Sequence, residues 1–289
     1  MDEMLKVEEI NKNYPTFSLK NVSFSVTPGE IMGFIGRNGA GKTTTLKCIM
    51  NLIHYESGAI YAFGKNMKTN ELECKQRIGF ALSEINYYPN KTIRQLMKVT
   101  KKFYKEFDDK KFEEACKLFN LNFDKKIKEL SSGMKVKYSV AIALSHNAEL
   151  LILDEPTSGL DPVSRDEILD IFRKIVKNKD RAILFSTHIT SDLDKCATNI
   201  TYIHDGSIVF TGSKEKFVDS YYFINDLTKN KDLIKEYISY KELDDHIEGL
   251  IHANKKDYFV ASGIEPIIPD LEQIMVYLER KNNDESFDL

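Results

Sequence analysis

The sequence predicts an α/β fold with a mainly parallel sheet core, an antiparallel β part, a helical subdomain and a small C-terminal α+β extension. Short apolar runs of strand character alternate with stretches of helical spacing, which is typical of strands covered by helices on both faces. Residues 36–43 read G-R-N-G-A-G-K-T and match the phosphate-binding pattern G-x-x-x-x-G-K-[ST]. An apolar run over 150–153 ends in two carboxylates, at the sheet edge where open α/β folds bind ligands.

The expected elements follow from local patterns. Residues 5–30 alternate in strand fashion and close with a Pro28-Gly29 turn. An apolar strand over 30–35 leads into the glycine-rich loop, and residues 44–50 have helical spacing. Further strands are expected at 59–63, 78–82, 150–155 and 182–186, with helical stretches over 93–145 and 164–177 and a hairpin-like pair over 200–211.

Composition narrows the function classes. The chain has 289 residues and a formal net charge of −3, so there is no electrostatic case for nucleic acid and no nucleic-acid partner is expected. No apolar run approaches the roughly 18 residues that a membrane-spanning helix needs. The four cysteines show no C-x-x-C spacing, which argues against metal or disulfide roles and favours a reducing cytosol.

The loop over 36–43 has a physical reason at each fixed position. Its glycines let the backbone wrap around a phosphate so that successive N–H groups point inward as an anion nest. The Lys42 ammonium can reach the β- and γ-phosphates, and the Thr43 hydroxyl can ligate Mg²⁺. The helix that follows would turn its N-terminus to the phosphates. The candidate nucleotide-binding residues here are Gly36, Arg37, Asn38, Gly39, Ala40, Gly41, Lys42, Thr43 and Thr44.

Two carboxylates, Asp154 and Glu155, end the apolar strand. One can hold a Mg²⁺ ion while the other orients an attacking water. A strand that ends in charge is common and need have no chemistry. Here the phosphate-binding loop upstream favours the catalytic interpretation.

Over residues 5–212 the chain resembles the ATPase, or nucleotide-binding, subunit of ABC transporters. The resemblance rests on six motifs in the family's order. They are Tyr14 at the aromatic A-loop position, Walker A at Gly36–Thr43, Leu130-Ser131-Ser132-Gly133-Met134 in place of the signature L-S-G-G-Q, Walker B with the catalytic glutamate at Leu150–Glu155, the D-loop Ser158-Gly159-Leu160-Asp161, and the H-loop His188.

The resemblance implies roles for these residues. Two such domains meet head to tail with two ATP molecules between them, and Ser131 and Gly133 face the γ-phosphate from the opposite subunit. Glu155 polarises the attacking water, while Lys42 and His188 contact the phosphates. Tyr14 stacks on adenine, although a half-buried strand tyrosine explains the same residue.

Two departures from the family pattern stand out. In the signature, Ser132 replaces a glycine and Met134 a glutamine, while the serine and the second glycine are kept. The Q-loop glutamine is missing: Ser83 falls at its position and Glu84 follows. Both are candidate Mg²⁺ ligands, and which of them reaches the metal is open. A plain connector into the helical region is the alternative.

The expected function is that of an ATP-binding and ATP-hydrolysing subunit, with ATP and Mg²⁺ as cofactors, that powers export through separate integral membrane permease subunits. The motif spacing and the segment 267–278 resemble prokaryotic drug- and peptide-resistance exporters. The partner ATPase would be a second copy or a different ABC subunit, and the location the inner face of the cell membrane. The domains are placed at 1–212, with a helical subdomain at about 84–148, and at 213–289. The alternative is a soluble ABC-type ATPase that acts as an assembly or regulatory module.

Overall fold

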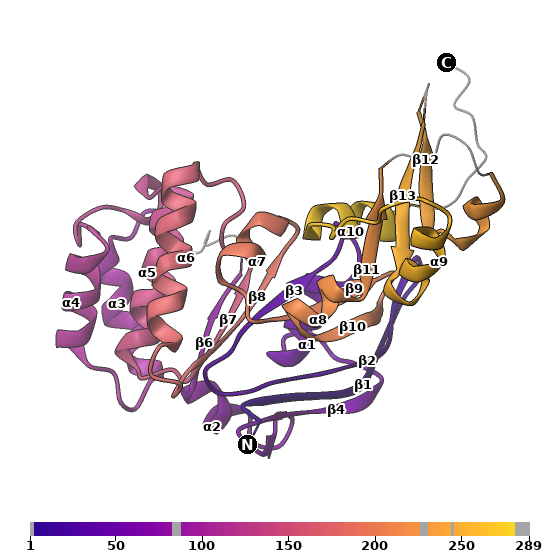
Figure 1. Cartoon of the computed structure of the whole chain (residues 1–289). Helices are drawn as coiled ribbons and strands as arrows, with labels where there is room; N and C mark the ends of the chain where they lie inside the picture. The colour runs from indigo at the N-terminus through magenta and orange to yellow at the C-terminus, as the bar shows by residue number, and fades with distance from the viewer. Residues whose placement is uncertain (1–2, 83–87, 226–230, 244–245, 281–289) are drawn as a thin grey trace. The chain divides into compact units, whose positions relative to one another are not determined.

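The structure is a computed structural model that describes residues 3–82, 88–225, 231–243 and 246–280 (Figure 1). The chain divides into two compact units, Met1–Thr211 and Gly212–Leu289. In the parts of the chain that are described, no helix has the length and apolar character needed to cross a bilayer.

The first unit contains a four-stranded antiparallel sheet in the order β2-β1-β4-β5. Strands β1 (Leu5–Tyr14) and β2 (Phe17–Val26) form a long hairpin that ends with Tyr14 paired to Phe17. Its apolar residues alternate with polar ones, so one face packs into the core. The remaining strands are β4 (Ser57–Ala62) and β5 (Lys65–Asn66).

The second sheet of this unit has six strands in the order β10-β9-β3-β8-β7-β6. Strand β3 is parallel to β8 and β9, and β7 is parallel to β6 and β8, which confirms the predicted mainly parallel core. Every residue of the three central strands is buried, as expected for a sheet covered on both faces. The strands are β3 (Ile31–Ile35), β6 (Ile78–Ala81), β7 (Leu150–Asp154), β8 (Ala182–Thr187), β9 (Asn199–His204) and β10 (Ser207–Ser213).

Helix α1 (Lys42–Ile49) follows β3, and α2 (Glu71–Gln76) precedes β6. Helix α6 (Pro162–Val176) begins two residues before the predicted start at 164. The Asp161 carboxylate explains the difference, because it caps the helix by accepting hydrogen bonds from the N–H groups of Val163 and Ser164, with a proline in the first turn. Helix α7 (Thr190–Cys196) follows β8.

The region predicted as helical over 93–145 is divided into several helices, which gather in one group in Figure 1. Phe112 and Tyr138 pack edge to face between two of them, with ring centroids 6.2 Å apart. Side-chain caps at Thr92, Asp108 and Ser131 set the helix starts. The elements are α3 (Ile93–Thr100), η1 (Lys101–Phe103), α4 (Asp109–Leu118), η2 (Ile127–Glu129) and α5 (Ser132–Ser145).

The second unit has its own three-stranded antiparallel sheet in the order β11-β13-β12. Ile224, Leu233, Ile251 and Phe259 are among the buried residues of its separate core. Its elements are α8 (Lys214–Asp219), β11 (Tyr221–Ile224), η3 (Lys231–Glu236), β12 (Ser239–Glu242), β13 (Ile247–His252), η4 (Ala253–Lys255), α9 (Lys256–Ala261) and α10 (Leu271–Glu279).

Candidate functional site

The candidate site is a cavity of about 750 Å³ at the carboxyl ends of the parallel strands. Strands β3, β7 and β8 end together there because they pair in parallel, with Ile35 in register with Thr187 and Asp154 with Ser186. Residues from all of the expected phosphate, carboxylate and histidine motifs contribute to its wall. The lining residues include Asn38, Gly39, Gly41, Lys42, Thr43, Thr44, Asp154, Glu155, Ser158 and His188.

The glycine-rich loop has the backbone that its pattern predicts. Gly41 precedes α1 with φ 113°, a left-handed conformation that favours glycine. A Cβ on Gly36 would lie 2.3 Å from the Ile203 carbonyl oxygen, so no other residue fits without moving the backbone. Gly39 borders the cavity, and apart from its two neighbours in the chain no described residue lies within 4 Å of where its Cβ would be. The loop therefore presents open backbone to the cavity, as a phosphate cradle must.

The remaining residues predicted to bind the nucleotide either stabilise the conformation of this loop or line the cavity. The Arg37 carbonyl accepts a hydrogen bond from Ala40 N–H at 3.1 Å. Ala40 is buried, and its own carbonyl accepts from Gly206 N–H at 3.0 Å. Asn38 and Thr44 line the cavity. Arg37 and Ala40 thus hold the loop through their backbone, while Asn38 and Thr44 border the space that a nucleotide would enter.

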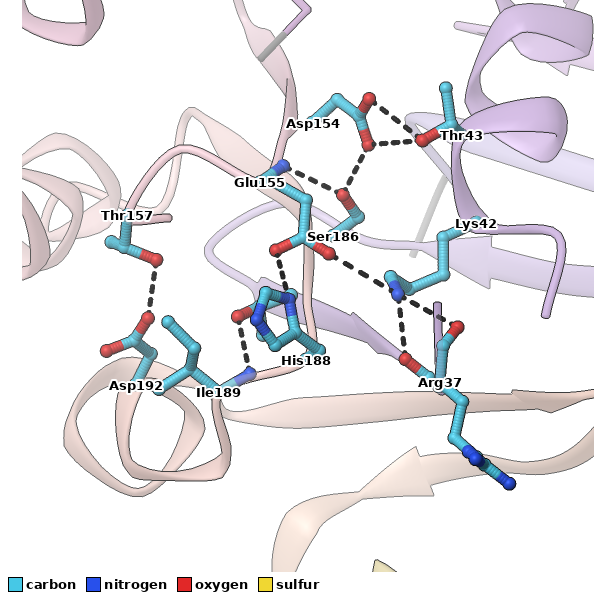
Figure 2. Close-up of polar contacts among 12 residues, drawn as sticks. Arg37, Lys42, Thr43, Asp154, Glu155, Thr157, Ser186, His188, Ile189 and Asp192 are labelled. Atoms are coloured by element: carbon cyan, nitrogen blue, oxygen red, sulfur yellow. Dashed lines mark hydrogen bonds and ion pairs between the residues drawn. The ribbon is translucent and has the colours of Figure 1, made fainter. Parts of the chain in front are cut away.

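Lys42 is 5% exposed and links the loop to the catalytic strand. Its ammonium donates to the carbonyls of Gly36 at 2.7 Å and Arg37 at 3.2 Å. The same group lies 3.3 Å from Glu155 Oε1 (Figure 2). These oxygen partners offset the free-energy cost of burying the Lys42 ammonium, which places a positive charge beside the loop.

Thr43 and Asp154 meet although they lie far apart in sequence. The Thr43 hydroxyl donates to the Asp154 carboxylate at 2.9 Å and 3.1 Å. Asp154 is 3% exposed and ends β7. A hydroxyl beside a carboxylate at the rim of a phosphate loop is an all-oxygen donor set of the kind that Mg²⁺ prefers. These two residues therefore fit the metal that accompanies a nucleoside triphosphate.

Glu155 lies between the Lys42 ammonium and the His188 imidazole. Its Oε2 is 2.8 Å from His188 Nδ1, and its Oε1 faces Lys42 (Figure 2). The backbone of Glu155 has φ 49°, which is uncommon for a residue with a Cβ. His188 directly follows β8. The glutamate predicted to polarise the attacking water and the predicted H-loop histidine are thus in direct contact.

The predicted signature residues lie at the start of α5. The Ser131 hydroxyl caps the helix by accepting a hydrogen bond from Met134 N–H at 3.3 Å. Gly133 is buried, and a Cβ there would make ordinary contacts with Leu160 and Ser164. Ser132, the residue that departs from the family pattern, lines the cavity.

At the A-loop position, Tyr14 is 42% exposed, with the Lys12 ammonium 5.1 Å from its ring centroid. Tyr14 is not among the residues that line the cavity. Phe17 is, and it is the only phenylalanine or tyrosine in the described part of that lining. Phe17 pairs with Tyr14 across the β1–β2 turn, so the two aromatic residues are neighbours.

Several residues at the site were not found from sequence. The signal for Phe17 was its position three residues after Tyr14, at the end of the same hairpin. Ser186 contacts both Asp154 and Glu155 and had only its closeness to His188 as a signal. Thr157, which directly precedes the D-loop, donates a hydrogen bond of 2.5 Å to Asp192 of α7. Burial raises the pKa of Asp192, and the bond from Thr157 opposes that rise.

The two candidate Q-loop ligands, Ser83 and Glu84, lie outside the described residues. Strand β6 ends at Ala81, and both Ala81 and Leu82 line the cavity. Ser83 and Glu84 follow Leu82 directly in the sequence. That one of them binds Mg²⁺ stays a prediction.

Comparison with known proteins places this geometry in a family. A family model described as "ABC transporter" matches residues 19–158, and one described as "AAA domain, putative AbiEii toxin, Type IV TA system" matches residues 126–191. The bacitracin transport ATP-binding protein BcrA of Bacillus licheniformis is 31% identical over 261 residues, covering 87% of this chain and 85% of BcrA. The chain belongs to the ATP-binding subunits of ABC transporters.

Other matches agree with this ABC subunit assignment. The glycine betaine/carnitine/choline transport ATP-binding protein OpuCA of Bacillus subtilis is 32% identical over 74% of this chain, although this chain covers only 59% of OpuCA. A solved structure described as the ATP binding subunit of an ABC transporter is 25% identical with a TM-score of 0.66, covering 74% of this chain and 91% of its own.

Family membership confirms several predictions made from the motifs. The fold is that of an ABC-type P-loop ATPase. The subunit is an ATPase with ATP and Mg²⁺ as cofactors. Proteins of this kind work as dimers with membrane permease partners.

Proposed function

We propose that this ABC subunit is the motor of an exporter, in which two ATPase domains close head to tail on ATP, hydrolyse it and drive separate permease subunits. The supporting observation is that Lys42, Thr43, Asp154, Glu155 and His188 converge on one cavity although they come from three separate parts of the chain. Positioning and electrostatic stabilisation supply most of the rate in phosphoryl transfer, and this constellation offers both.

In the proposed reaction, a water oxygen forms a bond to the γ-phosphorus while the bond from that phosphorus to the β,γ-bridging oxygen breaks. ADP and inorganic phosphate leave. The Glu155 carboxylate, which lies at the cavity wall, orients the water and accepts its proton. His188 lies against that carboxylate at 2.8 Å and lines the same cavity, so it would contact the γ-phosphate of a bound nucleotide.

Lys42 and the loop glycines bind the phosphates, and Thr43 and Asp154 would hold the Mg²⁺. When bound, Mg²⁺ neutralises charge on the β- and γ-phosphate oxygens. Lys42 supplies a fixed positive charge beside the same oxygens. These assignments rest on Lys42, Thr43 and Asp154 all lining one cavity.

For the dimer we propose that Ser131 and Gly133 act on the nucleotide of the opposite subunit. Ser131 caps α5, a helix of 14 residues. The N-terminal end of such a helix can bind an anion through its dipole and its backbone N–H groups. The pairing can be with a second copy or with a different ABC subunit. The test is the solution mass of Glu155→Gln protein, measured by light scattering with and without Mg-ATP.

A monomer that becomes a dimer only with Mg-ATP would support self-pairing. Lys42→Ala protein is the control, because it should neither bind ATP nor dimerise. Glu155→Gln protein that binds ATP and stays monomeric would contradict self-pairing and point to a different ATPase subunit.

Export and a place on the cytoplasmic face of the membrane are the remaining parts of the proposal. The support for both is the relative BcrA, which is named as a bacitracin transport ATP-binding protein. The match to BcrA covers 87% of this chain. The test is co-purification of the tagged subunit from gently solubilised membranes. A hydrophobic permease that co-purifies would support the motor. Recovery only in a soluble complex would favour the assembly or regulatory module instead.

A further inference from the structure

We propose that Ser186 is a positioning residue of the hydrolytic site, and that its side-chain hydroxyl holds the metal-site carboxylate and the backbone of the catalytic glutamate in a fixed relation. The proposal rests on the roles proposed above for Asp154 and Glu155. It adds a residue that none of the six sequence motifs singled out as functional.

The position of Ser186 follows from strand register. It is the fifth of six residues in β8 and pairs with Asp154, the last residue of the neighbouring parallel strand β7. Ser186 is fully buried. Register therefore brings its side chain to the point where the chain leaves β7 for Glu155, without any proximity in the sequence.

The hydroxyl of Ser186 uses both of its hydrogen-bonding functions on the site. It donates to Asp154 Oδ1 at 2.6 Å and accepts from Glu155 N–H at 2.9 Å (Figure 2). A serine hydroxyl has one proton to donate, and here that proton goes to the carboxylate. The same atom thus touches both of the residues that were predicted to divide metal binding and water activation.

Glu155 needs such a support because its backbone is in the left-handed region, with φ 49°. Non-glycine residues stay there only when their surroundings hold them. Its N–H is held by two acceptors, the Ser186 hydroxyl and the Ser186 carbonyl oxygen at 3.2 Å. This turn directs the Glu155 side chain to His188 and Lys42.

Asp154 is supported from two directions. Thr43 donates to its carboxylate from the phosphate loop, and Ser186 donates to it from β8. Two donors fix the rotation of a carboxylate better than one, and residues that orient a metal ligand affect metal affinity and activity even though they do not touch the metal. The contacts form one continuous path from Thr43 through Asp154 and Ser186 to Glu155.

Ser145 offers a matched comparison within the same unit. It is also fully buried, but its hydroxyl donates to the Ala141 carbonyl of its own helix at 2.5 Å. Removing that hydroxyl should affect folding stability without touching the site. Ser145→Ala therefore measures the cost of losing a buried serine hydroxyl as such.

The experiment compares Ser186→Ala, Ser186→Cys and Ser186→Thr with Ser145→Ala and the unaltered chain. Ser186→Cys keeps a side chain of similar shape with a weak donor, and Ser186→Thr keeps the hydroxyl. Three quantities are measured: kcat for ATP hydrolysis, the Mg²⁺ concentration that gives half of the full rate, and the melting temperature. Calorimetric titration with a non-hydrolysable ATP analogue, in Mg²⁺ and in EDTA, gives a binding measurement that does not depend on turnover.

We expect Ser186→Ala and Ser186→Cys to lower kcat by about 10- to 100-fold and to raise the required Mg²⁺ concentration, as loss of a ligand-orienting residue does. Binding of the analogue in EDTA should be unchanged, while the gain in affinity on adding Mg²⁺ should shrink. Ser186→Thr should restore most of kcat. If Ser186→Thr does not fold, a loss of Mg²⁺-dependent affinity in well-folded Ser186→Cys still supports the proposal.

The proposal is overturned if Ser186→Ala and Ser186→Cys keep the kcat and Mg²⁺ dependence of Ser145→Ala and differ only in melting temperature. That result would make the hydroxyl a packing feature. A failure of the catalytic assignment is a separate outcome, because it would appear as normal turnover in Glu155→Gln protein whatever Ser186 does.

Discussion

His188 Nδ1 lies 2.8 Å from Glu155 Oε2, so the side chains of the residues that directly follow the neighbouring strands β7 and β8 are in contact. The other carboxylate oxygen of Glu155 is 3.3 Å from the Lys42 ammonium. Glu155 therefore joins the phosphate loop to the histidine. A substitution of Lys42, Glu155 or His188 should therefore affect the other two side chains.

Glu155→Gln should bind ATP but lose turnover by about 100- to 10,000-fold, because the amide keeps the shape of the side chain and cannot take a proton from water. Equilibrium binding of ATP and steady-state phosphate release measure the two effects separately. Turnover at the wild-type rate would remove Glu155 from the catalytic role.

His188→Ala should reduce hydrolysis by about 100- to 1,000-fold, as expected when a group that stabilises developing charge is lost. Because His188 contacts Glu155, the two effects should not add. A double-mutant cycle of kcat with Glu155→Gln tests this. Full activity in His188→Ala would make the histidine structural, and strictly additive losses would show that the contact has no catalytic coupling.

Phe17→Ala and Tyr14→Ala should each weaken ATP binding, by about 1–3 kcal/mol if the ring stacks on the base. Phe17 lines the cavity, and Tyr14 is its partner across the hairpin turn. Phe17→Leu and Tyr14→Leu are the controls, because they keep apolar bulk without a ring. Unchanged affinity in Tyr14→Ala would leave that tyrosine a strand residue and assign any stacking to Phe17.

Glu84→Ala should impair Mg²⁺-dependent turnover more than Ser83→Ala, because a carboxylate binds Mg²⁺ better than a hydroxyl does. Both positions follow Leu82, which lines the cavity. The Mg²⁺ concentration that gives half of the full rate is the quantity to compare. The reverse ranking would favour the ungapped alignment, in which Ser83 takes the Q-loop position.

Stability should fall on mild acidification because of His146. Burial lowers the pKa of this imidazole from its ordinary value of 6.5, and its hydrogen bond to the Gln76 carbonyl opposes that shift only in part. As the pH falls below 6.5, His146 therefore becomes protonated in the unfolded chain before it does so in the folded chain. The free energy of unfolding consequently decreases as the pH falls.

His146→Phe keeps a ring against Tyr104, which stacks on His146 with centroids 3.7 Å apart, and it removes the titration. We expect its unfolding free energy to depend less on pH between about 7.5 and 5.5 than that of the unaltered chain. Denaturant unfolding of both proteins at several pH values measures the slope. Equal slopes would show that His146 does not contribute to acid sensitivity.

Local patterns predicted much of the fold correctly because their signals are contiguous in the sequence. The loop over 36–43 carries its glycines, lysine and threonine in one stretch, and an apolar run identifies β7 and the carboxylates after it. The stretch over 93–145 was predicted less well. Its helical spacing is real, but caps at Asp108 and Ser131 start new helices within it.

By itself the sequence determined which residue types stand at the ends of strands, and therefore the family and the chemistry. Only the tertiary structure decided which of them touch. Thr43 reaches Asp154 across 111 positions, and Ser186 reaches Asp154 across 32. The Ser186 contact depends on the register between the parallel strands β7 and β8, and the Thr43 contact depends on the packing of α1 beside β7. Both come from packing of the whole sheet with its helices rather than from any local stretch of chain.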